Sequence, residues 1–421
     1  MRLLVTIEHH FRRDSQGRVF PAPPSIVDYS FWRRYLDVFS EVLVLARVRR
    51  APEAKAAASR ADGPGVAFFD LPDYLGPWEY VWRIPTLRRR VREAVASVDA
   101  FILRVPGAIS QLAWREIRKK GVPFAVEVVG DPWDALSPGG VRTLLRPVFR
   151  RLWSRNQELM CGEASAASYV TRAALQRRYP PGPSTWTASV SSIDLRDGLV
   201  GTDKLEARIA ELRRSRGRGG SAERPWRVAF LGTLTSLYKG PDVLLNAVAF
   251  CVKGCLQLDV AIAGEGKCRP ELERLAAKLG LTGSARFLGA LPAGEPVRAL
   301  LDDTDLFVLP SRTEGLPRSL IEAMARGCPC IGSSVGGIPE LLPPEDMVRP
   351  GDADALARKI IEVLGDPGRM ERMARRNWEA AREYLPEILD RRRREFYTKI
   401  RELSGRGPRV ASLSSGVSEA V

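Results

Sequence analysis

The stretch that decides the fold is residues 305–342, which read DLFVLPSRTEGLPRSLIEAMARGCPCIGSSVGGIPELL. The apolar run 305–309 predicts a strand, and apolar residues that recur at helical spacing predict a helix beginning near Gly315 and ending at Gly327. Free backbone N–H groups of Gly315 and Leu316 would then point out of the helix N-terminus, where the helix dipole also favours an anion. The stretch therefore predicts a strand, loop and helix that bind a diphosphate.

Short apolar runs alternate with helix-length segments on both sides of this stretch. The runs are LLVTI, EVLVLARV, DAFILRV and PFAVEVV in the first half, and RVAFLG, QLDVAIAG, ARFLG and DLFVLP in the second. This alternation is typical of parallel, doubly wound sheets, and it occurs twice. We therefore expect an α/β protein of two Rossmann-like domains that face each other across a cleft, with ligands at the carboxyl ends of the strands.

The two copies of the pattern predict the domain boundaries. Residues 1–200 are assigned to the N-terminal domain and residues 226–385 to the C-terminal domain. The region between them, 201–225, ends in a basic, glycine-rich run without periodicity and is predicted to be a linker. A helix over 386–403 is predicted to pack back on the N-terminal domain, and the polar tail 404–421 is predicted to be disordered.

Length and composition favour a soluble, two-core protein. The chain has 421 residues, of which 45% are hydrophobic, and no apolar run approaches the ~18 residues that a membrane span needs. The opening MRLLVTIEHHF suits a first strand better than a signal peptide, so we expect a cytoplasmic protein. The six cysteines show no zinc-ligand spacing and are expected to be reduced and mostly buried.

The net charge of +15 has several interpretations. Solvated helix faces, phosphorylated substrates and an anionic membrane surface all fit, whereas nucleic acid is disfavoured because no nucleic-acid-binding motif accompanies the charge. Residues 141–155, VRTLLRPVFRRLWSR, place apolar side chains among five arginines. As a helix this segment would suit peripheral contact with an anionic membrane that carries a lipid-linked acceptor, or else would face the core with its arginines solvated.

Two carboxylates frame the predicted phosphate-binding helix. Glu314 stands just before it and Glu322 lies eight positions on, a separation on the order of 12 Å along a helix. Carboxylates accept hydrogen bonds strongly from pairs of hydroxyl groups, so one could hold hydroxyls at each end of a ligand that spans a diphosphate. The alternative is that Glu314 caps the helix and Glu322 is a surface residue.

The segment EGLPRSLIEAMARG, with its E-x7-E spacing, closely resembles the signature of the retaining GT-B glycosyltransferases, the group that includes sucrose synthase and bacterial mannosyl- and glucosyltransferases. The resemblance covers most of residues 226–384, where LYKGPDVLLNA, AIAGEG, ARFLGAL, DLFVLPS and GGIPELL follow the family's order. The N-terminal match is thinner. The resemblance implies transfer of a hexose from a nucleotide diphosphate sugar to an acceptor hydroxyl with retention of configuration, in polysaccharide, glycolipid or other glycoconjugate biosynthesis.

The resemblance also implies roles for particular residues. Glu314 would contact the donor sugar and Glu322 the ribose, while the Lys239 cation would stabilise the departing phosphate. The predicted donor-site residues are Gly232, Thr233, Lys239, Glu314, Gly315, Leu316, Pro317 and Glu322, and the predicted catalytic residues are Lys239 and Glu314.

The chain departs from its relatives at two places. Many relatives carry an arginine after the glycine equivalent to Gly232, whereas this chain has Thr233. The candidates to supply the missing charge are Arg312, Arg318 and Arg104. Where relatives place a histidine after a central strand of the N-terminal domain, this chain has Gly130 and Asp131.

The candidates for the acceptor side or the pocket are His9, His10, Arg104 and Asp131. Asp131 would bind hydroxyls or cap the next segment, and His9 and His10, just after the first strand, would line the pocket or be simple loop residues. The acidic cluster at 302–305 is assigned to capping and packing rather than to metal binding. We expect no metal and no cofactor, with the nucleotide diphosphate sugar as a substrate.

Two other functions use the same fold. A nucleotide-sugar epimerase or a phosphorylase shares the two-domain architecture, and a degenerate chain could bind sugar nucleotides without catalysis. The E-x7-E segment favours the transferase over the first pair, and the presence of Glu314, Glu322 and Lys239 argues against the second.

Overall fold

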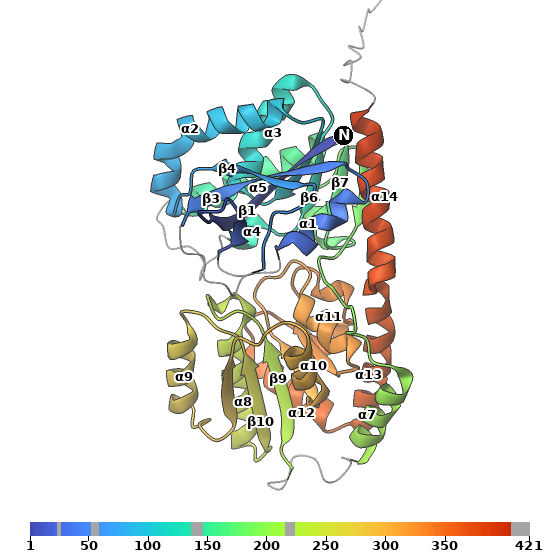
Figure 1. Cartoon of the computed structure of the whole chain (residues 1–421). Coiled ribbons are helices and arrows are strands. Elements are labelled where there is room, and N and C mark those ends of the chain that lie inside the picture. Colours follow the sequence, from blue (N-terminus) through green and yellow to red (C-terminus); the bar gives the residue numbers. More distant parts are fainter. Residues whose placement is uncertain (23–26, 52–58, 136–145, 215–223, 406–421) are drawn as a thin grey trace, which may run out of the picture.

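A computed structural model describes residues 1–22, 27–51, 59–135, 146–214 and 224–405. Two α/β domains lie one above the other, and the long helix α14 runs along one side of both (Figure 1). Of the tail predicted over 404–421, residues 406–421 lie outside the described residues, as does the part of the predicted amphipathic segment at 141–145.

The N-terminal domain is built on an eight-stranded sheet in which β1 lies centrally. The path is β4-β3-β1-β5-β6-β7-β8, every pair along it is parallel, and β2 pairs antiparallel with β1. The strands are β1 Arg2–Arg13, β2 Val19–Pro21, β3 Glu41–Arg50, β4 Val66–Leu71, β5 Ala100–Val105, β6 Ala125–Val128, β7 Ala166–Tyr169 and β8 Trp186–Ser189. The strand order reverses between β1 and β5, which marks a switch point where ligands of such sheets bind.

Helices cover both faces of this sheet. They are α1 Tyr29–Leu36, α2 Gly76–Ala96, α3 Ala108–Lys120, α4 Pro132–Ala135, α5 Arg146–Glu163 and α6 Ala174–Arg178. Buried side chains of α2, α3, α5 and α6 form one core with the sheet, and those of α1 and α14 form another on its opposite face. Helix α3 ends at Gly121, which adopts the left-handed conformation typical of a helix C-cap.

The C-terminal domain holds a six-stranded parallel sheet in the order β11-β10-β9-β12-β13-β14. The strands are β9 Trp226–Leu231, β10 Leu258–Ala263, β11 Ala285–Gly289, β12 Leu306–Leu309, β13 Cys330–Ser333 and β14 Met347–Val348. The order reverses between β9 and β12, so the loops after these two strands flank the second switch point.

The helices of this domain follow the strands. They are η1 Leu237–Lys239, α8 Pro241–Lys253, α9 Arg269–Lys278, α10 Glu295–Asp302, α11 Arg318–Ala325, η2 Ile338–Glu340, η3 Pro344–Asp346, α12 Ala353–Leu364, α13 Pro367–Ala381 and η4 Arg382–Tyr384. Helix α12 packs against α8, and α13 packs against α11. Two parallel α/β domains of this kind confirm the predicted fold class.

The buried apolar faces of two helices at the domain boundary, α7 and α14, show which domain each helix packs against. Residues 202–214, inside the segment predicted as a linker, form α7, and its Leu205, Ile209 and Leu212 join the core of the C-terminal domain. Helix α14, Pro386–Ser404, instead buries Phe396, Tyr397 and Ile400 against the N-terminal sheet. The chain therefore crosses between the domains twice. None of the helices in the described ranges combines the length and apolar content that a membrane span requires.

Two boundaries differ from the prediction. Helix α11 begins at Arg318, not near Gly315, because the ring of Pro317 disfavours the helical conformation for Leu316 before it. Strand β1 continues to Arg13 after an irregularity in its pairing between Thr6 and His10. His9 and His10 therefore lie within the strand, where the sequence had placed them just after it.

Candidate functional site

The C-terminal switch point brings Lys239 and Glu314 into contact. Lys239 ends η1 in the loop after β9, Glu314 lies in the loop after β12, and Lys239 Nζ is 2.6 Å from Glu314 Oε1. The hydroxyl of Ser311 donates to the same oxygen at 2.8 Å. The side chains of Lys239 and Glu314 are only 13% and 7% exposed, so this ion pair is shielded from bulk water and strengthened electrostatically.

The two loops are tied together around this pair. Arg312 donates to both carboxylate oxygens of Asp242, at 2.8 and 2.6 Å, and also donates to the carbonyl oxygen of Leu237 at 2.8 Å. Gly232 leaves room for the stem of Lys239, since a Cβ on this glycine would overlap Lys239 Cδ. Arg312 thus ties the two loops together, and its guanidinium group is already bound by Asp242 and Leu237 within the protein.

The segment between Glu314 and α11 is clamped by the glycines at 336 and 337. Gly337 N donates to the carbonyl oxygen of Gly315 at 2.7 Å, and a Cβ on Gly336 would overlap the carbonyl oxygen of Glu314. Pro317 is the N-cap of α11, and no side chain caps this helix end. The free N–H groups at the helix start therefore belong to residues 318–320, and the prediction that assigned them to Gly315 and Leu316 is corrected by one turn.

Glu322 lies one turn inside α11 and is partly buried. Burial raises the pKa of its carboxyl group above the ordinary value, and the nearby Arg318 cation offsets part of this rise. Within the described part of the chain, no hydrogen-bond donor or cation pairs with the Glu322 carboxylate. A partly buried carboxylate without a partner in the fold is suited to receive hydroxyl groups of a ligand.

Of the three arginines proposed to replace the missing charge at Thr233, two are engaged elsewhere. Arg312 pairs with Asp242, and Arg104 forms a buried ion pair with Glu127 of the neighbouring strand. Thr233 itself makes a local turn, in which its Oγ1 accepts from Thr235 N at 3.2 Å. Arg318 is exposed at the start of α11 and lies close enough to lower the pKa of Glu322. It is the candidate that remains beside the donor site.

The residues of the N-terminal domain that were predicted to line the acceptor side have partners within the chain. Asp131 accepts from Trp133 N at 2.8 Å and is also bound by Arg178 and the hydroxyl of Tyr179, so it caps the turn after β6. His10 Nδ1 lies 2.7 Å from Asp73 Oδ1, and the ring of His9 packs edge-on against Phe11 with centroids 5.3 Å apart.

The acidic cluster at 302–305 faces arginines. Asp302 pairs with Arg326, while Asp303 and Asp305 pair with Arg227. In the described residues, no three His, Cys, Asp or Glu side chains gather as a set of metal ligands.

Two buried or bridging carboxylates near the facing edges of the domains were not among the predicted site residues. Glu8, near the irregularity in β1, accepts from Ile109 N at 2.6 Å at the start of α3, and burial raises the pKa of its carboxyl group. Glu340 of the C-terminal domain accepts from the N–H groups of Arg172, Ala173 and Ala174 at 2.6, 2.9 and 2.7 Å. Two features of the sequence could have identified them. Glu8 directly follows the apolar run LLVTI, and Glu340 is the acidic residue of the segment GGIPELL.

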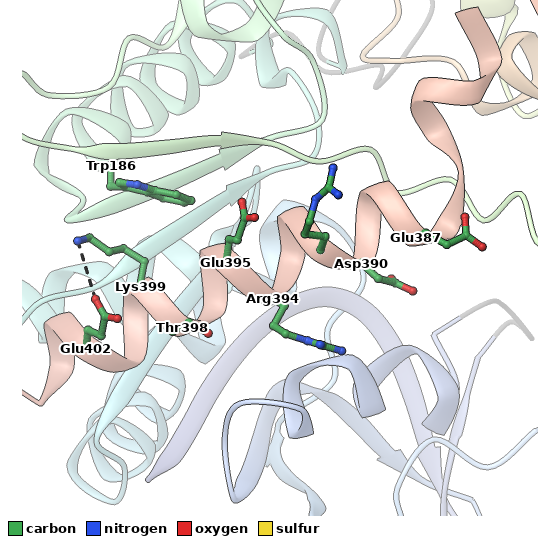
Figure 2. Close-up of a pocket in the computed structure, with 9 residues that line it drawn as sticks. Trp186, Glu387, Asp390, Arg394, Glu395, Thr398, Lys399 and Glu402 are labelled. Atoms are coloured by element: carbon green, nitrogen blue, oxygen red, sulfur yellow. Dashed lines mark ion pairs between the residues drawn. The ribbon is translucent and has the colours of Figure 1, made fainter. Parts of the chain in front are cut away.

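A separate surface pocket of about 580 Å³ lies along α14, next to Trp186 (Figure 2). It is lined by Trp186, Glu387, Asp390, Arg391, Arg394, Glu395, Thr398, Lys399 and Glu402. Both acidic and basic side chains of α14 line it, and Lys399 Nζ is 3.9 Å from Glu402 Oε2. None of the predicted site residues lines it, so we do not assign the site to this pocket.

The geometry of the C-terminal domain agrees with comparisons to known proteins. Residues 213–380 match the family model described as Glycosyl transferases group 1. The C-terminal domain is a glycosyl transferases group 1 domain. The sucrose-phosphate synthase from Thermosynechococcus elongatus superposes with a TM-score of 0.70 at 16% identity, covering 97% of this chain and 100% of that chain. The whole chain therefore has the GT-B fold, and we class it as a glycosyltransferase.

Other comparisons extend over the same architecture. The Anabaena protein Alr3699/HepE, in its complex with UDP-glucose, has a TM-score of 0.61 at 18% identity and covers 94% of this glycosyltransferase and 98% of that chain. Protein CapJ from Staphylococcus aureus is 23% identical over 336 residues, which are 79% of each chain. Further curated relatives are 28–35% identical, but their matches span only 36–49% of their own length.

Proposed function

We propose that this glycosyltransferase moves a hexose from a nucleotide diphosphate sugar to an acceptor hydroxyl and retains the anomeric configuration. The observation that carries the proposal is the shielded contact between Lys239 and Glu314 at the switch point of the C-terminal sheet. A cation that can bind a phosphate, Lys239, lies beside a carboxylate that can accept hydrogen bonds from sugar hydroxyls, Glu314. A donor whose sugar is joined to a phosphate needs both groups.

The donor would lie along the start of α11. Glu314 accepts hydrogen bonds from sugar hydroxyls, and Lys239 moves from Glu314 to the phosphate as the donor enters. The N–H groups at the start of α11 and the Arg318 cation hold the diphosphate, and the Glu322 carboxylate accepts the ribose hydroxyls. The remaining predicted donor-site residues shape this segment: Gly232, Thr233, Gly315, Leu316 and Pro317.

Bond breaking at the donor leaves negative charge on the diphosphate. The bond between the anomeric carbon and the phosphate oxygen breaks, and the oxygen of the acceptor hydroxyl forms its bond on the same face of the sugar. The departing phosphate oxygen accepts the proton of that hydroxyl. Lys239 and the α11 N–H groups stabilise the leaving charge, so the step needs neither a metal nor a cofactor in this proposal.

The names of similar proteins support a nucleotide sugar and a hexose. One fold relative was solved with UDP-glucose, and another is a sucrose-phosphate synthase. We propose an acceptor that is a glycan or a lipid-linked glycan, and a cytoplasmic protein with peripheral contact to an anionic membrane. For that contact the first half of α5, which exposes Val148 and Leu152, is one candidate.

Calorimetric titration with a panel of nucleotide diphosphate sugars, followed by product analysis with an acceptor, tests the proposal. We expect one donor to bind, and Lys239→Ala and Glu322→Ala each to weaken binding or turnover by about tenfold or more. Lys253→Ala and Glu271→Ala, on exposed helix positions of the same domain, are the matched controls. Wild-type donor affinity and turnover in both site variants would refute the site.

The same assay separates the alternative activities. A transferase forms product only when the acceptor is present, an epimerase changes the donor without any acceptor, and a phosphorylase needs inorganic phosphate. A protein that only binds would titrate with the donor and release no nucleotide.

A further inference from the structure

Helix α2 turns large apolar side chains toward solvent. Trp78 and Trp82 are 74% and 84% exposed, and Val81 and Leu75, the residue before the helix, are exposed as well. The two tryptophans are four residues apart, so their rings lie on the same side of the helix. Tryptophan is highly buried on average, and a cluster of exposed apolar side chains marks an interaction surface.

The opposite face of α2 supplies the packing. Leu87, Val91, Ala94 and Val95 are buried in the core that α2 shares with the N-terminal sheet. The outward face is therefore not needed to hold the helix in place. At helical spacing the stripe of Trp78 and Trp82 continues through exposed Arg89 and Arg92. The outward face is apolar in its first turns and basic in the following ones.

The neighbouring helices extend this basic surface. Arg92 of α2 pairs with Glu116 of α3 at 3.3 Å, and Asn156 of α5 donates to Gln111 of α3 at 2.9 Å, so α3 lies between α2 and α5. The three helices carry thirteen Arg and Lys against five Glu. This layer lies on the sheet face opposite α14, and α2 is at its outer edge (Figure 1).

The exposed apolar residues gather at one end of the layer. Trp78 and Trp82 are in the first turns of α2, and the exposed Val148 and Leu152 are in the first turns of α5. Helices that connect parallel strands run antiparallel to them, so their first turns lie toward the carboxyl edge of the sheet. That edge faces the C-terminal domain, as the contact of Glu340 with Ala174 shows.

We propose that the outward face of α2, with Trp78 and Trp82, docks on the surface of an anionic lipid bilayer. The inference deepens the peripheral membrane contact proposed above and moves its centre from α5 to α2. Indole rings favour the boundary between headgroups and acyl chains, and adjacent arginines attract anionic headgroups. A second copy of the chain fits less well, because a symmetric contact would bring the same arginines face to face.

Docking in this way would bring the carboxyl edge of the N-terminal sheet close to the bilayer. A lipid-linked acceptor would then need to lift only its polar headgroup to reach the N-terminal domain. The association itself requires no donor and no turnover, so it can be measured apart from the transferase activity.

Flotation of the full chain with lipid vesicles tests the inference. We expect binding to vesicles that contain phosphatidylglycerol, weaker binding to pure phosphatidylcholine, and release at high salt. The double substitution Trp78→Ala and Trp82→Ala should lower the bound fraction by about tenfold, and Arg89→Glu should also weaken binding. Phe250→Ala, which removes an exposed aromatic side chain from α8, is the matched control and should bind as wild type.

Each other outcome is decisive. If wild type fails to bind anionic vesicles at low salt, both this inference and the general membrane contact fail, while the transferase proposal stands on its own assays. If wild type binds but the tryptophan double variant binds equally, the contact lies elsewhere, and a Leu152→Asp variant tests α5. If the double substitution instead abolishes a dimer seen by sedimentation without lipid, α2 is a protein interface. The unfolding temperature and circular-dichroism spectrum of the double variant, measured without lipid, should equal those of wild type and show that the N-terminal domain, which carries α2, is folded.

Discussion

The Glu340 carboxylate of the C-terminal domain accepts a hydrogen bond of 2.7 Å from the backbone N–H of Ala174 in the N-terminal domain. The same carboxylate accepts from Arg172 N and Ala173 N, and the Arg172 side chain donates to the carbonyl oxygen of Glu340 at 2.9 Å. The start of the short helix α6 is thus capped by the opposite domain. This contact joins the domains on the loop that follows the clamp at Gly336 and Gly337.

We therefore predict that Glu340→Ala weakens domain closure. Loss of a charged acceptor leaves three N–H groups without a partner, so the closed arrangement becomes less stable relative to the open one. We expect kcat to fall by about tenfold with a smaller change in donor affinity, because the donor-binding domain itself is intact. Small-angle scattering with donor should show a larger radius of gyration than wild type.

Glu340→Gln is the matched variant, since its carbonyl oxygen still accepts from backbone donors. It should recover part of the lost activity. Equal kcat in wild type and Glu340→Ala would show that the contact does not govern closure.

A second prediction concerns Lys239. Its replacement by Ala removes the cation that neutralises the leaving phosphate and also leaves Glu314 without its partner. We expect kcat to fall by about 100-fold to 1,000-fold, as when a single preorganised charge-stabilising group is lost. Donors with better leaving groups should show a smaller loss.

The comparison of donors with different leaving groups separates a chemical role of Lys239 from a role in holding the loop. A uniform loss for all donors, together with a lower unfolding temperature, would mean that Lys239 acts only by supporting the loop. Lys253→Ala should leave kcat unchanged for every donor.

The fold was predictable because it rests on local patterns that every element repeats. Alternating apolar runs and helix-length segments give two parallel sheets, and both switch points follow from the strand order. The residues Lys239 and Glu314 were predicted from the family resemblance, and each follows a strand next to the switch point. Their direct contact was not, since it depends on how two loops fold against each other.

Other features depended on contacts that a single sequence does not display. Asp131 and Arg104 carry the right chemistry for a pocket, yet partners from distant segments engage them. Glu340 lies in the segment GGIPELL, but its three donors come from residues about 170 positions earlier in the chain. The start of α11 could have been read correctly from Pro317, whose effect on the preceding residue is local.

The partly buried Glu322 predicts a conflict between stability and function. Burial raises the pKa of this carboxyl group in the folded state above its unfolded value, so folding favours the protonated form. Its contribution to stability is therefore fully present below the ordinary pKa of glutamate and is lost as pH rises through the raised folded-state pKa. Glu322→Gln, which stays neutral, should become more stable than wild type as pH rises through this interval.

Urea unfolding of both proteins at a series of pH values measures the effect. Each unit by which the pKa is raised corresponds to about 1.4 kcal/mol of difference in unfolding free energy at neutral pH. Glu322→Gln should also bind the donor more weakly, because an amide accepts ribose hydroxyls less strongly than a carboxylate. A pH-independent difference in stability would contradict the raised pKa.

The last prediction concerns the charge that relatives supply at the position of Thr233. Arg318 is the arginine left to face the diphosphate, whereas Arg312 is held by Asp242. Arg318→Ala should therefore weaken donor binding by about tenfold with only a small loss in the free energy of unfolding, since the side chain is exposed and its stabilising interaction is with Glu322. Arg312→Ala should do the reverse and destabilise the loops first.

A rescue experiment makes this assignment specific. Thr233→Arg introduced into the Arg318→Ala protein should restore donor affinity, because it returns a cation to the loop after β9 where many relatives carry one. The hydroxyl of Thr233 makes only a local contact with Thr235, so the fold should tolerate the change. Calorimetry with the preferred donor reads out all three proteins. If Arg318→Ala binds the donor as wild type does, the diphosphate is held by the α11 N–H groups and Lys239 without an arginine.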